Sequence, residues 1–391
     1  MSNESKSKPM VLIVGAGLGS ALSVGPLILP ILQQLGVYEE FLSISKYMTH
    51  ITMYNEALKP YKPTDYSLVE EFSGYGYYIV TRPLLYALIL RQVPPEKLHF
   101  GKRVNVIIDQ GEKVVIETSD NMTHEGDILV GADGAHSTVR KHLYKTLKDK
   151  EALPKSDQED LPFSCTCLVG QTIPLDPEEF PVMKEPVCQF QIVLGKGKPY
   201  TTPKDLISKV MLEEKVFKTW HSGRIALLGD ACHKLHPSSG QGAVTAMHDA
   251  IVLANLLYTI PSTSSKDISQ ALGEYQAERY PAAIDSFRSS QQGARVLEKS
   301  PTGAVALYVS THAPLWLWKS VLEKMLRHRP LVGFLDPIER KGSLAPVVSP
   351  STVKARALFE RRWRSQQQEK KQKKERQEEK EEQEEKHAVV A

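Results

Sequence analysis

The sequence predicts an α/β fold, in which short apolar strands alternate with helices. An apolar run at Val11–Val14 passes directly into a glycine-rich turn, a pattern typical of a strand that leads into a phosphate-binding helix N-terminus. A second apolar run, Ile225–Leu228, ends at Gly229-Asp230, and apolar residues at helical spacing follow from about Gly242. Between these two runs, strand-like and helix-like segments recur in turn, which favours a sheet with helices packed on it.

The chain is long enough, at 391 residues, for two or three domains with a substantial core. It is 41% hydrophobic and 24% charged, as is usual for a globular protein, and its net charge of +3 does not favour nucleic acid as a partner. Cysteines are few, and we interpret them as reduced thiols of a cytoplasmic protein: Cys165, Cys167, Cys188 and Cys232.

Neither export nor a membrane-spanning helix is predicted. The first ten residues lack the apolar core of a signal peptide, and no window contains 18 uninterrupted apolar residues. The segment 313–335 carries two tryptophans and a basic face, and two interpretations of it stay open. It is either a helix that makes peripheral contact with a membrane surface or, as we favour, a helix packed on its own domain.

The elements expected between the two apolar runs are mostly short. Residues 49–81 contain HITMY, YSLVEEF and YGYYIVT, which we interpret as strands. A helix is expected from Arg82-Pro83, because proline is tolerated at the first helical position. The segments on either side of Gln110-Gly111 predict a β-hairpin, and DILVGADG predicts a further buried strand.

The second half of the chain is expected to be mainly helical. FSCTCLVG and VCQFQIVLG predict two strands, and the sequence after residue 203 resembles a helix. Helical sequence also follows residue 261. The end of the chain is a run of charges that predicts a solvated helix or a disordered tail.

The glycine-rich turn lacks the two elements that normally follow it. A helix from Leu18 would have to include Gly25, Pro26 and Pro30, and each proline in a helix interior costs about 3 kcal/mol. A dinucleotide-binding fold also needs a second strand that ends in an acid about 20 residues past the glycines. Glu39 and Glu40 lie near that distance, but they follow helix-like sequence.

Three motifs occur in a characteristic order: VLIVGAGLG, GADGAHSTVR and GRIALLGDACHKLHPSSGQGA. With them the chain resembles the class A FAD-dependent monooxygenases of the p-hydroxybenzoate hydroxylase type, in the style of fungal secondary metabolism, from about Met10 to Leu335. The resemblance implies a Rossmann-like FAD-binding domain, a small β-rich substrate domain and a helical C-terminal region. We expect the FAD-binding domain at 1–160 and 203–260, the substrate-domain sheet at 45–80 and 161–202, the helical region at 261–345 and a charged tail at 346–391.

The resemblance also implies which residues hold FAD. Gly15 and Gly17 would contact the pyrophosphate, Asp133 would serve FAD and NAD(P)H, and Asp230 would bind the ribityl chain. Three further residues match family positions: Arg82 opens a helix near FAD, Gly25 lies in a return loop, and Ala243 lies beside the flavin ring. Independently of the family, a helix N-terminus at Gly242 would favour a reduced, anionic flavin.

Several of these assignments have structural alternatives. Asp230 could be an N-cap, Asp133 part of a tight turn, and Arg82 a surface ion-pair residue. The nearby Cys232, His233 and His236 suggest a metal site, but one loop supplies no fourth ligand, and we expect no metal.

The resemblance implies that NAD(P)H reduces FAD and that one oxygen atom is delivered to a small aromatic or isoprenoid-type organic substrate. Because the cofactor performs the hard step, we name no catalytic side chain. A helix and an acid-ended strand are missing between GAGL and GSALSVGP, and substrate-sheet strands are missing near GKPYTTPKDL. Two hypotheses follow: an FAD-dependent monooxygenase, or a truncated, non-catalytic remnant with impaired FAD binding.

Overall fold

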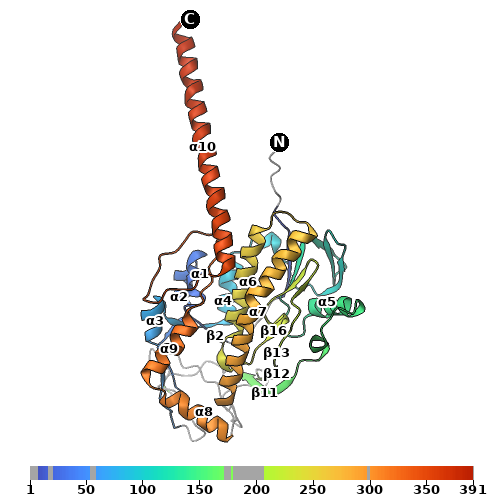
Figure 1. Cartoon of the computed structure of the whole chain (residues 1–391), viewed down its shortest axis with the longest axis vertical. Helices are drawn as coiled ribbons and strands as arrows, with labels where there is room; N and C mark the ends of the chain where they lie inside the picture. Colours follow the sequence, from blue (N-terminus) through green and yellow to red (C-terminus); the bar gives the residue numbers. More distant parts are fainter. Residues whose placement is uncertain are drawn as a thin grey trace.

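The computed structural model describes residues 8–15, 21–52, 59–170, 178, 207–296 and 300–390 (Figure 1). Its central sheet has the strand order β1-β10-β15-β14. Strands β1 (Val11–Val14), β10 (Ile128–Gly131) and β15 (Ile225–Leu227) are parallel, and the short β14 (His221–Ser222) is antiparallel to β15. The strands predicted at both apolar runs and at DILVGADG are therefore confirmed, as is the α/β class.

Two long helices, α6 (Gly242–Thr259) and α7 (Ser265–Val296), run side by side through the middle of the molecule (Figure 1). The residues Val252, Leu253 and Leu256 of α6 pack in one core with the buried strands β10 and β15. The same core receives α5 (Thr138–Asp149) and the hairpin of β7 (Val104–Asp109) and β8 (Val114–Thr118). The predicted α6 is confirmed, and its buried apolar face explains why this segment is helical.

A second core lies on the other side of α6. It is built from β2 (Ala21–Val24), β6 (Tyr77–Thr81), α1 (Leu29–Gln34), α2 (Tyr38–Ser43) and α4 (Arg82–Leu90). Val244 and Ile251 of α6 belong to this core, so α6 joins the two halves of the molecule. The three-stranded sheet here has the order β2-β6-β3, with β3 at Lys46–Met48. As predicted, Pro83 lies in the first turn of α4, and YGYYIVT contains a strand.

A second three-stranded sheet contains the predicted hairpin. It consists of β7 (Val104–Asp109), β8 (Val114–Thr118) and β9 (Thr123–Gly126), all antiparallel. Four short strands form two further antiparallel pairs. These are β4 (His50–Ile51) with β5 (Thr64–Asp65), and β13 (Lys215–Val216) with β16 (His233–Lys234). Single 3₁₀ turns lie at Pro95–Lys97, Lys155–Gln158, Gly229–Ala231 and Pro237–Ser239.

Two predicted elements are wrong. The YSLVEEF segment was expected to be a strand, but Leu68–Ser73 forms helix α3, because Val69 and Phe72 pack against α9 (Leu315–Leu326). The helix expected after residue 203 is instead strand β12 (Ile207–Glu213), which pairs along its length with β11 (Phe163–Gly170). The expected strand VCQFQIVLG lies outside the described residues.

The C-terminal part is helical. Helices α8 (Pro301–His312) and α9 (Leu315–Leu326) meet at a corner at one end of the molecule, and α10 (Pro350–Val390) projects from the opposite end (Figure 1). Among the α10 side chains that the structure describes, the buried ones lie in the first turns, at Ser351, Thr352 and Ala355. Among the described helices, none combines the length and the apolar character needed to cross a membrane.

Candidate functional site

The carboxyl ends of the parallel strands β1, β10 and β15 meet at one edge of the central sheet, where open α/β sheets bind ligands. Gly15 follows β1 with a φ of +139°. A Cβ at this position would lie 2.1 Å from the carbonyl oxygen of Ala132, just beyond β10. The two strand ends are therefore in contact, and only glycine fits there.

Helix α6 packs against the turn that follows β15. Gly229 has a φ of +60°, and a Cβ on it would lie 2.9 Å from the Cβ of Ala246. Asp230, next along the chain, is partly exposed, and its carboxylate accepts a 2.6 Å hydrogen bond from the Lys234 ammonium. The turn therefore presents an ion pair, rather than a lone carboxylate, at the mouth of the site.

Helix α6 begins at Gly242 and Ala243 without a side-chain cap, because the Gln241 side chain makes no capping hydrogen bond. Apart from the neighbouring residues and the backbone of α6 itself, no atom of the described residues lies within 4 Å of the position that a Cβ on Gly242 would occupy. Among the described residues there is thus room beside the first residue of this 18-residue helix, at its positive end. Uncapped amides with room in front of them can hold an anionic or strongly accepting group.

A buried ionic network, which sequence analysis missed, supports this site. The carboxylate of Asp249 accepts hydrogen bonds from Arg279 Nε at 2.8 Å and from the Gly229 amide at 3.2 Å, and His233 Nε2 lies 2.6 Å from it. Burial tends to raise the pKa of Asp249, but His233 and Arg279 outweigh it and lower this pKa. The charged carboxylate therefore connects α6 and α7 to the backbone of the Gly229 turn.

The sequence contains one sign of this network, an acid at position 249 on a helix whose neighbouring turns carry Val244, Met247 and Ile251. The structure shows that Asp249 is fully buried, and a buried acid requires a partner. The partner Arg279 lies 30 residues further along the chain. Because no local pattern connects the two positions, only the tertiary structure pairs them.

The β2 side of the molecule approaches the same helix. His248 of α6 is buried, and its Nε2 lies 3.0 Å from the carbonyl oxygen of Leu27. Gly25 lies just before, and a Cβ on it would lie 2.2 Å from the Tyr77 ring. A Cβ on Gly240 would be 3.7 Å from Ser23 Oγ, so the loop before α6 lies beside β2. The structure thus brings the predicted Gly25 segment close to the predicted Gly242 segment.

Acid is expected to destabilise the chain through His248. Burial, and secondarily Arg279, lowers the pKa of His248 to about 4, although Asp249 opposes this. The unfolded chain, with a pKa near 6.5, takes up more protons than the folded chain, so stability is lost as pH falls from 6.5 towards 4. The total loss in the free energy of unfolding is about 3 kcal/mol, since each pKa unit corresponds to 1.36 kcal/mol.

The matched variant is His248→Gln, whose amide can donate to Leu27 without titrating. Urea unfolding at pH 7 and pH 5 should show the parent losing about 2 kcal/mol more than the variant. Equal losses in the two proteins would contradict this role of His248.

Asp133 is already engaged by its own helix. Its carboxylate accepts hydrogen bonds from the amides of Thr138 at 2.7 Å and Val139 at 3.2 Å, and from Ser137 Oγ. Asp133 therefore satisfies the first amides of α5, and Gly134 makes the turn with a φ of +81°. Both carboxylate oxygens point to protein groups in this arrangement.

Three further predicted residues complete the comparison. Arg82 is half-buried at the first position of α4. Gly17 lies outside the described residues. Ala243 follows Gly242 in the first turn of α6. The structure therefore brings together Gly15, Asp133, Asp230, Gly242 and Ala243 around one sheet edge and one helix start.

The described residues do not form the part of a dinucleotide site that would bind adenosine. Strand β1 is the edge of the central sheet, and Ile13 within it is 69% exposed. Glu39 and Glu40, the acids nearest the expected distance, lie on α2, where Glu40 pairs with Arg91. The edge that would carry a second strand and its ribose-binding acid is open among the described parts of the chain.

A possible metal set, Cys232, His233 and Asp249, has ligand atoms within 4.8 Å of one another. Burial strongly raises the pKa of the Cys232 thiol, and Asp249 already binds the Arg279 cation. The set therefore has the chemistry of a buried ion pair rather than of a cation site. His236 is not part of the set; its Nδ1 accepts from the Ser238 amide.

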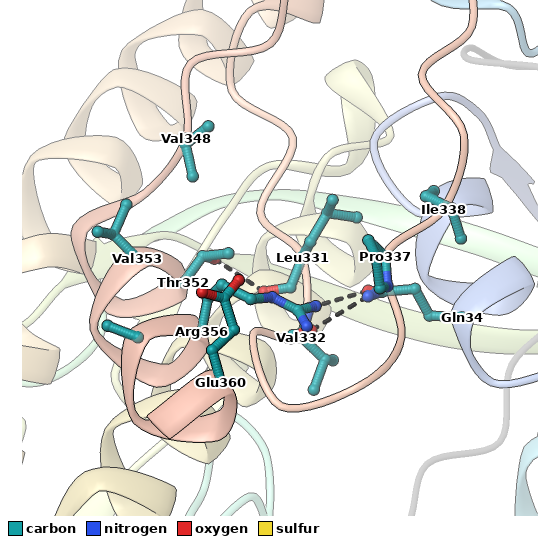
Figure 2. Close-up of a pocket in the computed structure, with 11 residues that line it drawn as sticks. Gln34, Leu331, Val332, Pro337, Ile338, Val348, Thr352, Val353, Arg356 and Glu360 are labelled. Carbon is teal, nitrogen blue, oxygen red and sulfur yellow. Dashed lines mark hydrogen bonds between the residues drawn. The ribbon is translucent and has the colours of Figure 1, made fainter. Parts of the chain in front are cut away.

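One surface pocket lies away from this site, at the base of α10 (Figure 2). It has a volume of about 350 Å³. Figure 2 shows Val353, Arg356 and Glu360 of α10 on one side and Gln34, Pro337 and Ile338 on the other. None of the predicted flavin-site residues lines it.

Comparison with known proteins shows which proteins this chain is similar to. Residues 195–290, which include the Gly229 turn and the start of α6, match a family model described as an FAD binding domain. The chain is 26% identical to the FAD-dependent monooxygenase ausM of Penicillium brasilianum, over 71% of each chain. It is also 26% identical to ausM of Aspergillus calidoustus, over 83% of this chain and 82% of that one.

The fold is also that of solved flavoproteins. HpxO of Klebsiella pneumoniae, solved with FAD and uric acid, superposes with a TM-score of 0.54 at 18% identity, covering 80% of this chain and 85% of that chain. This likeness concerns the fold.

The alignments show that the relatives contain segments absent from this chain. The first alignment extends over 345 positions but uses 71% of the 391 residues here, about 278, which leaves about 67 positions without a counterpart. The second extends over 389 positions and uses 83%, about 325, which leaves about 64. The two values agree, and both have the size of several secondary-structure elements.

Proposed function

We propose that this chain, which resembles the class A FAD-dependent monooxygenases, holds its flavin across the carboxyl ends of β1, β10 and β15, with the ring at the start of α6. The uncapped first turn of α6, open at Gly242, is the observation that carries this proposal. It lies next to the Gly229 turn, which Asp249 holds in place. The helix end would stabilise negative charge on a reduced ring.

The residues present fit the flavin half of FAD better than the adenosine half. On the flavin side, the Gly229 turn, Asp230 and the α6 start are all in place. On the adenosine side, β1 is an edge strand, and among the described residues no acid-ended strand lies beside it. We therefore propose that the chain holds flavin mainly through the ring and ribityl groups.

When bound, the flavin would transfer electrons from NAD(P)H to oxygen and deliver one oxygen atom to a small aromatic or isoprenoid-type organic substrate. The chain's own residues would bind and orient the flavin. The α6 amides would face the ring, and Asp230 would accept hydrogen bonds from ribityl hydroxyls. We place the substrate over the ring face, beside the β2-β6-β3 sheet.

The alternative proposal is a truncated remnant that no longer catalyses. It is favoured by the 64 to 67 positions of the related proteins that have no counterpart in this chain, and by the exposed side chain of Ile13. The two proposals share the same ancestry and differ in flavin occupancy. A visible spectrum of the purified protein, followed by addition of NADPH or NADH under nitrogen, separates them. A flavin band that bleaches supports the enzyme, and a colourless protein that takes up no added flavin supports the remnant.

Asp230→Ala is expected to weaken flavin binding by about 10- to 100-fold, because a charge-assisted hydrogen bond contributes about 1.5 to 3 kcal/mol. Lys234→Met is the companion variant, since it removes the cation that pairs with Asp230 and leaves the carboxylate. Fluorescence-quenching titration with FAD gives both affinities. Unchanged affinity in Asp230→Ala would remove Asp230 from the site.

A further inference from the structure

The corner between α8 and α9 is an exposed apolar surface that contains none of the residues proposed to hold flavin. Five large side chains here are each more than half exposed: Val305, Tyr308, Val309, Leu315 and Trp316. They come from α8, from its second turn onwards, and from the first turn of α9, and the two helices are joined by Ala313-Pro314. Figure 1 shows this corner at the end of the molecule opposite the projecting part of α10.

The surface lies within an uncharged stretch. Residues 301–318 contain no Asp, Glu, Lys or Arg, in a chain that is 24% charged. Positive charge begins immediately afterwards, with Lys319, Lys324 and Arg327 against a single acid, Glu323. Such an arrangement of apolar and aromatic side chains next to basic ones matches the boundary between the acyl chains and headgroups of an anionic bilayer.

The two tryptophans of α9 have different roles. Trp316 is 71% exposed, whereas Trp318 packs edge-on against Tyr66 and donates from Nε1 to the carbonyl oxygen of Asp65 at 2.6 Å. Leu322 and Leu326 are fully buried against α3. The second half of the segment 313–335 is thus packed on the body, and the free surface lies earlier in the chain, on both helices.

We propose that the α8–α9 corner, residues 305–316, docks this protein on an anionic lipid bilayer. Helix α8 has 12 residues and is about 18 Å long at 1.5 Å per residue, too short for a hydrocarbon core of about 30 Å. The corner therefore enters one leaflet and does not cross the membrane. Tyr308 and Trp316 lie at the depth of the headgroups, and the lysines of α9 contact anionic lipid.

The test is sedimentation of the full chain with vesicles of phosphatidylcholine alone and with added phosphatidylserine. We expect the parent to sediment with the anionic vesicles, and the double variant Val309→Asp/Trp316→Ala to bind them at least tenfold more weakly. The matched control is Trp363→Ala, which removes a 54% exposed tryptophan from α10 and should bind as the parent does. Circular dichroism melting checks that all three proteins are folded.

A parent that stays in the supernatant with both vesicle types would overturn the proposal. An equal loss of binding in Trp363→Ala would also overturn it, because the effect would not be specific to the α8–α9 corner. If the double variant instead converts a lipid-free dimer to a monomer, a second copy covers this surface and the proposal is wrong. None of these readouts depends on flavin, so the result is independent of the proposed flavin site.

Discussion

Replacing Arg279 with methionine is expected to lower the free energy of unfolding by about 3 to 5 kcal/mol, the usual cost of leaving a buried charge without its partner. Asp249 is fully buried and Arg279 nearly so, and their hydrogen bond is 2.8 Å long. Without the guanidinium, the carboxylate retains only His233 and the Gly229 amide. Urea denaturation at neutral pH measures the loss.

The matched control is Arg288→Met on the same helix. Arg288 is 72% exposed, and its partner Asp285 lies 4.0 Å away at the surface, so this change should cost less than about 1 kcal/mol. Similar losses in the two variants would mean that the buried network does not stabilise the fold beyond an ordinary surface pair.

Restoring the missing dinucleotide-binding elements is expected to raise FAD affinity by several hundred-fold. The change is an insertion of one helix and one acid-ended strand between Gly19 and Ser20. A helix N-terminus at the pyrophosphate is worth up to about 2 kcal/mol, and a ribose-binding carboxylate adds about 1.5 to 3 kcal/mol. At 1.4 kcal/mol per tenfold, these gains together give the expected factor. The measurement is flavin bound per purified chain.

The control insertion carries asparagine in place of the terminal acid and should recover only the helix contribution. The insertion should also improve soluble yield, because the new strand would cover the exposed edge of β1 and the side chain of Ile13. Stoichiometric FAD in the unmodified chain would contradict this account, since it would mean that other residues hold the adenosine half.

Sequence patterns predicted those parts of the fold whose signals are local. The β7–β8 hairpin follows from two β-rich runs around Gln110-Gly111, and α6 follows from apolar residues that recur every three or four positions. The failures are segments decided by distant partners. Leu68–Ser73 is helical because α9 covers one face of it, and Ile207–Glu213 is a strand because β11 offers an edge.

The candidate site was predictable to the same extent. Glycines whose conformation is set by a close neighbour, such as Gly15 beside Ala132, follow from the motif itself. The partners of charged side chains do not. The motif does not show that Asp133 satisfies the amides of α5, that Asp230 pairs with Lys234, or that Asp249 supports the Gly229 turn.

The central proposal is that this chain, which resembles the class A flavoproteins, binds flavin through the flavin half of the site without the adenosine half. Titration of the purified chain with FAD and with FMN under identical conditions tests it most directly. If the adenylate makes no effective contact, the two dissociation constants should agree within about threefold, a difference of less than 0.7 kcal/mol. FAD bound more than 100-fold tighter than FMN would contradict the claim.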